Sequence, residues 1–281
     1  AKPRKNSDGQ SNDVLGTVID ITIQKIYERQ LKQFTEELQR SNQDLEQFAY
    51  VASHDLQEPL RKIRAFGDRL TIKYKASLDG LGADYIHRMQ MAAARMQALI
   101  EDLLAFSRVS RTGVFFEPLD MMMVMEEVMD DLEAQIKREG AVLQLGELPK
   151  IRGERTQIKR LMQNLINNAV KFHKPREKPI VHISGRVVNV REVERELGIS
   201  LPNVNIDYCW LSVKDNGIGF DEKYSDRIFN IFQRLNGRTE YEGTGIGLAI
   251  CRKIVANHNG FITVRSKENT GSEFIITLPK G

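Results

Sequence analysis

A run of apolar residues with heptad spacing restricts the fold of this chain more than any other feature. Between residues 27 and 52 the apolar positions follow one another at alternating steps of four and three, interrupted only by Ser41. They are Tyr27, Leu31, Phe34, Leu38, Leu45, Phe48 and Ala52. This spacing is typical of the buried seam of a coiled coil, which one helix alone cannot cover. The sequence therefore predicts a long helix that packs against a partner helix.

The stretch FAYVASHDLQEPLRKI, residues 48–63, places a histidine and an aspartate side by side in the same helix. With Ala52 in the seam, His54 lies on the face turned away from the partner helix. The next two apolar steps are both four residues long, which is a stutter that unwinds a supercoil locally. Pro59 removes a backbone donor and favours a kink nearby. We therefore expect an exposed His54 beside a weak point in the helix, although such a histidine, taken alone, is more often an ordinary surface residue.

A second amphipathic helix follows the turn-like segment SLDGLGAD, residues 77–84. Its apolar residues again alternate in steps of four and three: Tyr85, Met89, Ala92, Met96, Leu99, Leu103 and Phe106. Two amphipathic helices joined by a tight turn cannot bury both stripes, whereas two copies can form a four-helix bundle. We therefore expect a homodimer through this helical hairpin. The segment SRVSRTG, residues 107–113, would end the hairpin as a linker.

Length and composition limit the remaining possibilities. The 281 residues favour about two domains, and the net charge of +3 does not favour nucleic acid or an anionic membrane as a partner. Cys209 and Cys251 have no paired spacing, so we expect neither a disulfide nor a zinc site, and a cytoplasmic location is the default. No apolar run approaches the roughly 18 residues of a membrane span, although this segment could belong to a longer protein.

The second half mixes helices and strands and predicts an α+β sandwich, with helices covering one face of a mostly antiparallel sheet. We expect helices over about 120–138, 154–172 and 244–257, and strands near 141–145, 180–188, 208–215, 260–266 and 272–278. Residues 187–209 form an unusually long connection with a charged, helix-like centre. We expect a surface excursion there.

The stretch NLINNAVKF is the first of three that point to chemistry. Asn164 and Asn168 lie four residues apart on one face of a helix, and Lys171 follows one turn later. Asparagine is a mediocre helix former, but its amide oxygen suits Mg²⁺, and a lysine can contact a phosphate as a point charge. The alternative is a pair of buried asparagines that hydrogen-bond to backbone groups.

Two glycine-rich stretches follow. In VKDNGIGF, glycines permit a tight turn after a strand, and Asp215 could accept a hydrogen bond from an exocyclic amine such as that of adenine. EGTGIGLAI opens a helix with three glycines, Gly243, Gly245 and Gly247. Backbone N–H groups without a covering Cβ at a helix N-terminus form an anion site. It is neither a P-loop nor a Rossmann fingerprint, since no Gly-Lys-Ser/Thr and no βαβ unit accompany it.

In this order, the stretches resemble the sequence boxes of the sensor histidine kinases of two-component signalling. SHDLQEPLR resembles their phosphoacceptor box, NLINNAVKF the N box, DNGIGF and GTGIGLAI the glycine boxes, IFNIFQRL the phenylalanine box and TGSEFIITLP the closing strand. The resemblance covers about residues 24–279. It implies a dimeric helical hairpin followed by an ATP-binding domain, ATP-dependent autophosphorylation of a histidine, and phosphotransfer to an aspartate of a response regulator.

The resemblance also implies a role for each matching residue. His54 would accept the γ-phosphoryl group of ATP, and Asp55 would polarise or deprotonate its imidazole. The nucleotide site would comprise Asn164, Asn168 as the Mg²⁺ ligand, Lys171, Asp215 as the adenine-reading carboxylate, Gly217, Gly219, Phe229, Phe232, Gly243, Thr244, Gly245, Gly247 and Leu248. The two phenylalanines would together anchor a lid, whose residues 234–245 we expect to be mobile without nucleotide.

The domain division follows from the same resemblance. The polar start and the β-rich segment VLGTVIDIT resemble the end of a PAS sensor domain, whose ligand-binding body would precede this chain. We therefore expect a disordered start with a last PAS-like strand (1–23), a coiled-coil linker and phosphoacceptor hairpin (24–112), and an ATP-binding domain (113–281). Many relatives carry Thr or Asn four residues after the phosphoacceptor; Glu58 stands there in this chain, which puts phosphatase activity in doubt.

Two other interpretations remain open. A non-catalytic dimeric scaffold would bind nucleotide or a receiver domain without transferring phosphate, although every box is intact. A gyrase-type ATPase coupled to mechanical work would explain the ATP site, but not SHDLQEPL on a coiled-coil hairpin.

Overall fold

The computed structural model describes residues 20–74, 79–109, 115–198, 206–235, 241 and 243–280, without the side chains at 38, 39, 42–50, 52 and 54. The chain divides between Phe48 and Ala49 into two units. The strand expected over residues 14–22 falls mostly outside the described residues. Its last residue, Thr22, already begins a helix, because Asp20 accepts the Thr22 backbone N–H at 2.9 Å.

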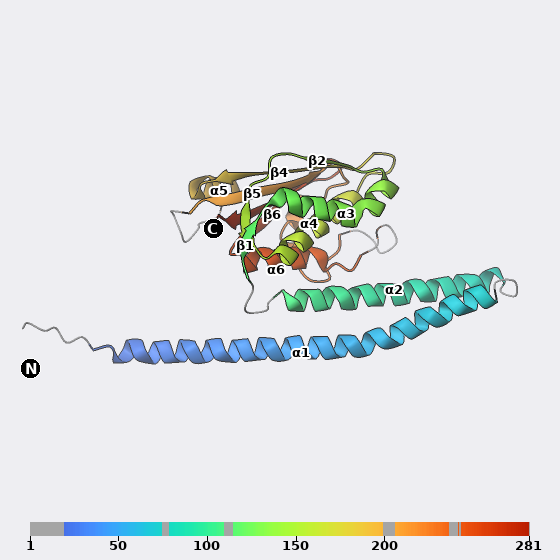
Figure 1. Ribbon diagram of the computed structural model, residues 1–281, viewed down its shortest axis with the longest axis horizontal. Helices are drawn as coiled ribbons and strands as arrows, with labels where there is room; N and C mark the ends of the chain where they lie inside the picture. The colour runs from blue at the N-terminus through green and yellow to red at the C-terminus, as the bar shows by residue number, and fades with distance from the viewer. Residues whose placement is uncertain are drawn as a thin grey trace, which may run out of the picture. The chain divides into compact units, whose positions relative to one another are not determined.

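Two long helices, α1 (Thr22–Lys73) and α2 (Gly80–Arg108), correspond to the two helices of the predicted hairpin (Figure 1). Pro59 lies inside α1, yet the helix continues through it, and Figure 1 shows α1 curving instead of breaking. Asp79 caps α2 by accepting the Gly82 backbone N–H at 2.6 Å. This cap starts the helix earlier than Tyr85, so the predicted turn over residues 77–84 is too long at its C-terminal end.

The C-terminal part of α1 packs antiparallel against α2. Arg64 donates a hydrogen bond to Gln97 Oε1 at 2.8 Å, and Asp68 accepts one from Gln90 Nε2 at 2.5 Å. A Cβ atom at Gly67 would lie 2.9 Å from Gln90 Cγ, so the missing side chain allows the two helices to approach. The predicted pairing of two amphipathic helices is therefore confirmed within one chain.

A five-stranded sheet forms the centre of the second half. Its strands run in the order β2 (Val142–Leu145), β4 (Ile180–Val188), β5 (Tyr208–Asp215), β7 (Gly271–Pro279) and β6 (Phe261–Lys267). β2 pairs with β4 in parallel, and the other three pairs are antiparallel. The prediction of a mostly antiparallel sheet is thus confirmed.

Three helices cover one face of this sheet: α3 (Met121–Glu139), α4 (Arg155–Lys171) and α6 (Gly247–Asn257) (Figure 1). The main core between them includes Leu161, Leu165, Ile183, Leu211, Ile250 and Ile254, all fully buried. α6 begins three residues later than the predicted residue 244. The reason is Gly245, whose φ of 76° is left-handed and cannot belong to a right-handed helix.

Two short strands, β1 (Glu117–Leu119) and β3 (Ile151–Gly153), form a separate antiparallel pair that the sequence did not predict. Each strand has only three residues, and Pro118 argues against a strand in a sequence. The predicted linker over residues 107–113 is also too long. α2 continues to Arg108, and the next residue, Val109, is buried in the main core.

The predicted surface excursion over residues 187–209 is corrected by the structure. β4 extends to Val188, and a short helix α5 (Val190–Leu197) follows. α5 buries Val190 and Val193 in a second hydrophobic cluster with Trp210 of β5, on the sheet face away from α4 and α6. Two single 3₁₀ turns, Glu222–Tyr224 and Arg227–Phe229, complete the described elements, and residues 199–205 lie outside the described part.

Candidate functional site

Asp215 ends β5 with a carboxylate that is held by backbone groups. Its Oδ1 accepts the N–H of Gly217 at 2.8 Å and the N–H of Ser272 at 3.1 Å. Burial raises the pKa of this carboxyl group to about 6, and the two backbone hydrogen bonds oppose that increase. Both of these bonds fall on one oxygen, so the second oxygen is suited to accept a hydrogen bond from a ligand.

The glycines of DNGIGF allow the chain after Asp215 to approach neighbouring backbone closely. A Cβ atom at Gly217 would lie 2.3 Å from the carbonyl oxygen of Phe172, just after α4. Gly219 has a φ of 58°, and a Cβ atom there would lie 2.0 Å from the carbonyl oxygen of Lys267. The predicted tight turn is therefore present, and it joins the end of β5 to the end of α4.

The N-box residues on α4 face the start of α6. Asn164 Nδ2 lies 3.4 Å from the carbonyl oxygen of Gly247, in the first turn of α6. Lys171 lies farther along α4, and its Nζ would be 2.7 Å from a Cβ atom at Gly243. Asn168, between them in sequence, is partly buried. The structure thus brings the N box and the second glycine box together, as expected from the resemblance.

The N-terminus of α6 has the features of an anion site. Ile246 occupies the cap position, and no side chain among the described residues caps the helix. Gly243 and Gly245 have φ angles of 149° and 76° and carry no side chain, whereas Thr244 between them accepts the Ile246 N–H at 3.3 Å through Oγ1. Leu248 packs against the main core and fixes the first turn. Uncapped N–H groups here carry the positive end of the helix dipole.

Arg234 and Tyr241, both in the predicted lid, make hydrogen bonds within the lid and to the residues that follow α4. Arg234 donates hydrogen bonds to the carbonyl oxygens of Gly243 at 2.9 Å and Tyr241 at 2.5 Å. The Tyr241 ring lies 5.0 Å from that of Phe172, and its hydroxyl donates to His173 O at 3.3 Å. Residues 236–240 and 242 lie outside the described residues, so mobility over residues 234–245 stays a prediction.

Phe229 and Phe232 do not form one anchor, which corrects the sequence interpretation. Phe229 is buried and meets Phe274 edge to face, with ring centroids 6.5 Å apart. Phe232 is 62% exposed and has a φ of 63°. This left-handed backbone turns the Phe232 side chain away from the core while its N–H donates to Gly245 O at 3.0 Å.

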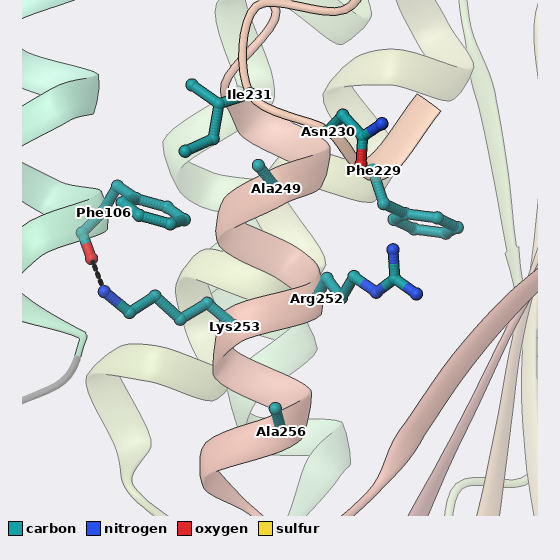
Figure 2. Close-up of a pocket in the computed structure, with 8 residues that line it drawn as sticks. All are labelled: Phe106, Phe229, Asn230, Ile231, Ala249, Arg252, Lys253 and Ala256. Carbon is teal, nitrogen blue, oxygen red and sulfur yellow. Dashed lines mark hydrogen bonds between the residues drawn. The ribbon is translucent and has the colours of Figure 1, made fainter. Parts of the chain in front are cut away.

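A groove of about 430 Å³ runs along α6 (Figure 2). Its lining residues are Phe106, Phe229, Asn230, Ile231, Ala249, Arg252, Lys253 and Ala256. Lys253 Nζ donates to Phe106 O at 2.7 Å and closes one side. Of the residues implied to form the nucleotide site, Phe229 lines the groove, whereas Asp215, Asn164 and Lys171 do not.

The phosphoacceptor stretch lies on α1. His54 belongs to this helix, but its side chain lies outside the described part of the structure. Asp55 is exposed. Glu58 pairs with Lys62 at 2.7 Å, one turn later and also exposed, so the carboxylate that departs from the family pattern is bridged by a cation.

Two family models match this chain. Residues 44–112 match the "His Kinase A (phospho-acceptor) domain", and residues 153–281 match the "Histidine kinase-, DNA gyrase B-, and HSP90-like ATPase". The first match covers the hairpin from residue 44 onward, and the second covers every nucleotide-box residue placed above. This chain carries the catalytic core of a sensor histidine kinase.

Several known proteins resemble this sensor histidine kinase. Cyanobacterial phytochrome A of Nostoc sp. is 39% identical over 265 residues, which cover 94% of this chain and 32% of that protein. Phytochrome-like protein Cph1 of Synechocystis sp. is 36% identical over 253 residues, 90% of this chain and 31% of that protein. The histidine kinase chain therefore spans about a third of the length of these relatives.

The fold of this histidine kinase is similar to that of full-length ShkA, solved in complex with AMPPNP. The TM-score is 0.59 at 21% identity, over 82% of this chain and 45% of that one. In the described part of the histidine kinase, no helix is long and apolar enough to cross a bilayer. Within the same residues, no three His, Cys, Asp or Glu side chains are grouped so as to hold a metal ion.

Four residues at the site were missed by sequence reasoning: Asp102, Arg160, Arg234 and Tyr241. Thr244 Oγ1 donates to Asp102 Oδ2 at 2.6 Å, and Arg160 Nη2 lies 3.4 Å from Asp102 Oδ1. Arg160 precedes Asn164 by four residues, so its helical spacing could have revealed it. Asp102 gives no local signal, because its partners lie far away in the sequence.

Proposed function

We propose that this chain transfers the γ-phosphoryl group of ATP to His54 and then to an aspartate of a response-regulator receiver domain. The observation that carries the proposal is that α4 borders both candidate contacts: its Asn164 faces the uncapped start of α6, and its end lies against the turn after Asp215. This arrangement stands in a domain that follows a phospho-acceptor match. We assign the phosphoacceptor hairpin to residues 24–112 and the ATP-binding domain to residues 113–281.

The described residues fit an adenine nucleotide. The Asp215 carboxylate offers an acceptor for the exocyclic amine, at the bottom of a turn that only glycines can form. The backbone N–H groups at the start of α6 and the Lys171 ammonium offer donors and positive charge for the phosphates. A neighbour in fold, ShkA, was solved with a non-hydrolysable ATP analogue, which supports the proposal.

The donor set also fits one Mg²⁺ ion bound chiefly through nucleotide oxygens. Asn168 would hold it through its amide oxygen, since Mg²⁺ needs few protein ligands when phosphates and waters complete its octahedron. When bound, the ion would supply neutralisation of the phosphate charge. The remaining chemistry rests on side chains of the chain itself.

Transfer requires a neutral imidazole on His54. An unperturbed imidazole is partly neutral near pH 7, and the unprotonated ring nitrogen would form the new bond to phosphorus as ADP leaves. Asp55 would hold the proton on the other ring nitrogen and fix the tautomer. Neighbouring residues on a helix point about 100° apart, so Asp55 must use a rotamer that bends back towards the ring.

A second copy of the chain is the expected partner of the hairpin. Tyr27, Leu31 and Phe34 of the seam are 67%, 69% and 65% exposed, and Tyr85 and Met96 of α2 are 66% and 45% exposed. Apolar stripes of this length need a covering surface, and a four-helix bundle of two hairpins supplies one. A PAS-like sensor domain before the chain would then control the bundle.

Incubation with γ-labelled ATP, followed by acid treatment, tests the proposal. Phosphohistidine is labile to acid, so the label should appear on the protein and disappear on acidification. A nucleotide-binding scaffold without transfer would acquire no label, and an ATPase of the gyrase type would release phosphate without labelled protein. Either result would replace the kinase proposal with that alternative.

A further inference from the structure

Asp102, near the end of α2, contacts two residues of the ATP-binding region at once. Its Oδ2 accepts the Thr244 hydroxyl at 2.6 Å, and its Oδ1 lies 3.4 Å from Arg160 Nη2. Thr244 belongs to the glycine-rich stretch before α6, while Arg160 lies on α4. A carboxylate from the hairpin thus gathers donors from both elements that border the candidate phosphate site.

Arg160 lies where a phosphate-binding residue would be useful. It shares one face of α4 with Asn164 and Asn168, because the three residues are spaced by four. Its Nε is buried and has no hydrogen-bond partner among the described residues. The contact to Asp102 is long, so the guanidinium is incompletely satisfied. A guanidinium matches the geometry of a phosphate, which would satisfy these donors better.

Further contacts fix the end of α2 against α6. Lys253 Nζ donates to Phe106 O at 2.7 Å and lies 4.1 Å from the Phe106 ring centroid (Figure 2). Asn257 Nδ2 donates to the carbonyl oxygen of Val109. These bonds come from the face of α6 beside the groove. Asp102 therefore reaches Thr244 from a docked helix and not as a freely moving surface side chain.

Building on the proposed nucleotide binding, we propose that Arg160 and Thr244 contact the γ-phosphate of ATP. Without nucleotide, the Asp102 carboxylate binds these same two side chains and so competes with the phosphate until ATP displaces it. A terminal phosphate carries more negative charge than one carboxylate and offers more acceptor oxygens. The Asp102 carboxylate and the phosphate repel each other, so the two occupants exclude one another. Displacement removes two contacts that hold α2 on this domain, which couples nucleotide binding to release of the hairpin.

The Asp102→Asn variant tests the competition. It removes the charge but keeps the size of the side chain and one oxygen acceptor. We expect ATP to bind about three- to ten-fold more tightly than to the wild type, in line with the loss of one partly exposed ion pair. ADP lacks the γ-phosphate, which is the terminal phosphate of ATP, so the affinity for ADP should change by less than about two-fold. Calorimetry of both nucleotides with Mg²⁺ gives the two ratios.

Glu101→Gln is the matched control. Glu101 is the exposed neighbour on α2, and its Oε1 accepts a hydrogen bond from the Gln97 amide at 2.9 Å; among the described residues it makes no hydrogen bond to Thr244 or Arg160. The substitution removes one negative charge from the same turn of α2 and should leave the affinities for ATP and ADP unchanged. An equal gain in Glu101→Gln would show a general charge effect and overturn the specific role of Asp102.

Arg160→Gln tests the second half of the proposal. It should weaken ATP binding more than ADP binding, and it should abolish the gain of Asp102→Asn in the double variant. Additive effects, or equal changes for ATP and ADP, would overturn the phosphate contact. If Arg160→Gln does not fold, the comparison of Asp102→Asn with Glu101→Gln still decides. A wild type that binds no ATP contradicts the proposed function itself, whereas a wild type that binds and labels normally while Asp102→Asn is unchanged contradicts only this inference.

Discussion

Asp215 at the end of β5 accepts the backbone N–H of Ser272, near the start of β7, with 3.1 Å between Oδ1 and N. Burial raises the pKa of Asp215 to about 6 even with this bond and the bond from Gly217. The carboxyl group therefore changes its charge just below neutral pH. This makes the candidate adenine contact testable by pH.

Affinity for ATP should fall as the pH drops through about 6, because protonation removes the charged acceptor for the adenine amine. The free energy of unfolding depends on pH in the opposite direction. A raised pKa means that the folded state favours the protonated carboxyl group, so Asp215 stabilises the fold most at low pH, and this stabilisation is lost as the pH rises through about 6. ATP affinity measured against pH in the wild type and in Asp215→Asn isolates the effect, since the nucleotide phosphates titrate in both. Parallel profiles would rule out the contact.

His54→Gln should abolish acid-labile labelling while leaving ATP affinity and dimerisation nearly unchanged, because it removes a nucleophile that lies off the predicted seam. His87→Gln is the control, since His87 is an exposed histidine on the other helix of the hairpin. It should label like the wild type. Label that persists in His54→Gln and disappears in His87→Gln would move the phosphoacceptor to α2.

Asn168→Asp should impair Mg²⁺-dependent ATP use, because an added negative charge beside the triphosphate changes the placement of the ion. Asn167→Asp makes the same change one residue away, on an exposed side chain that accepts a hydrogen bond from Gln135 at 2.7 Å. Affinity and labelling rate across a Mg²⁺ titration compare the two. If both variants respond alike, Asn168 has no special role at the metal.

Replacing the two phenylalanines should separate stability from transfer. Phe229→Ala removes a buried ring and should lower the free energy of unfolding by about 3–5 kcal/mol. Phe232→Ala removes a ring that is 62% exposed and should change it by less than about 0.5 kcal/mol. It should still slow single-turnover labelling at saturating ATP, because an exposed aromatic ring beside Gly245 can dock another surface. Weaker ATP binding with a normal labelling rate would show that Phe232 contributes only to the nucleotide site.

His258 should make the fold sensitive to acid. Burial lowers its pKa, its Nε2 accepts the Glu154 N–H at 3.0 Å, and its Nδ1 contacts Ile254 O at 2.8 Å. A lowered pKa stabilises the fold above the ordinary value of 6.5, and this stability is lost as the pH falls through the lower folded value. Urea unfolding of wild type and His258→Gln at several pH values measures the difference. An identical pH dependence would mean that other groups control acid unfolding.

Periodic segments were predicted to within a few residues, because the apolar spacing of α4 and β5 directly reflects which face is buried. Local chemistry also pointed to Asp215 and Asn164, whose roles in binding stay predictions. The pair β1 and β3 escaped prediction because three residues carry no period and Pro118 disfavours a strand. Contacts between distant segments, such as that of Asp102 with Thr244, depend on how whole helices dock, which no local pattern contains.

The backbone conformation of single residues could not be predicted from the sequence either. Phe232 looks like a partner of Phe229 when spacing alone is considered, but its left-handed φ of 63° places it outside the core. The helix α5 was visible as a charged segment, whereas its two buried valines gave no sign of which surface would receive them.

The position of α5 has a consequence for the opposite side of the sheet. Cys209, Leu211 and Val213 of β5 face the main core, while Tyr208 and Trp210 face the α5 cluster. Sliding β5 by one residue along β4 or β7 would exchange these two sets and force an indole into the space against α4. Because both faces oppose such a slip, only one register is open to the strand. The small hydrophobic cluster under α5 thereby helps to fix the register of β5. The register in turn determines where Asp215, the last residue of β5, lies relative to α4.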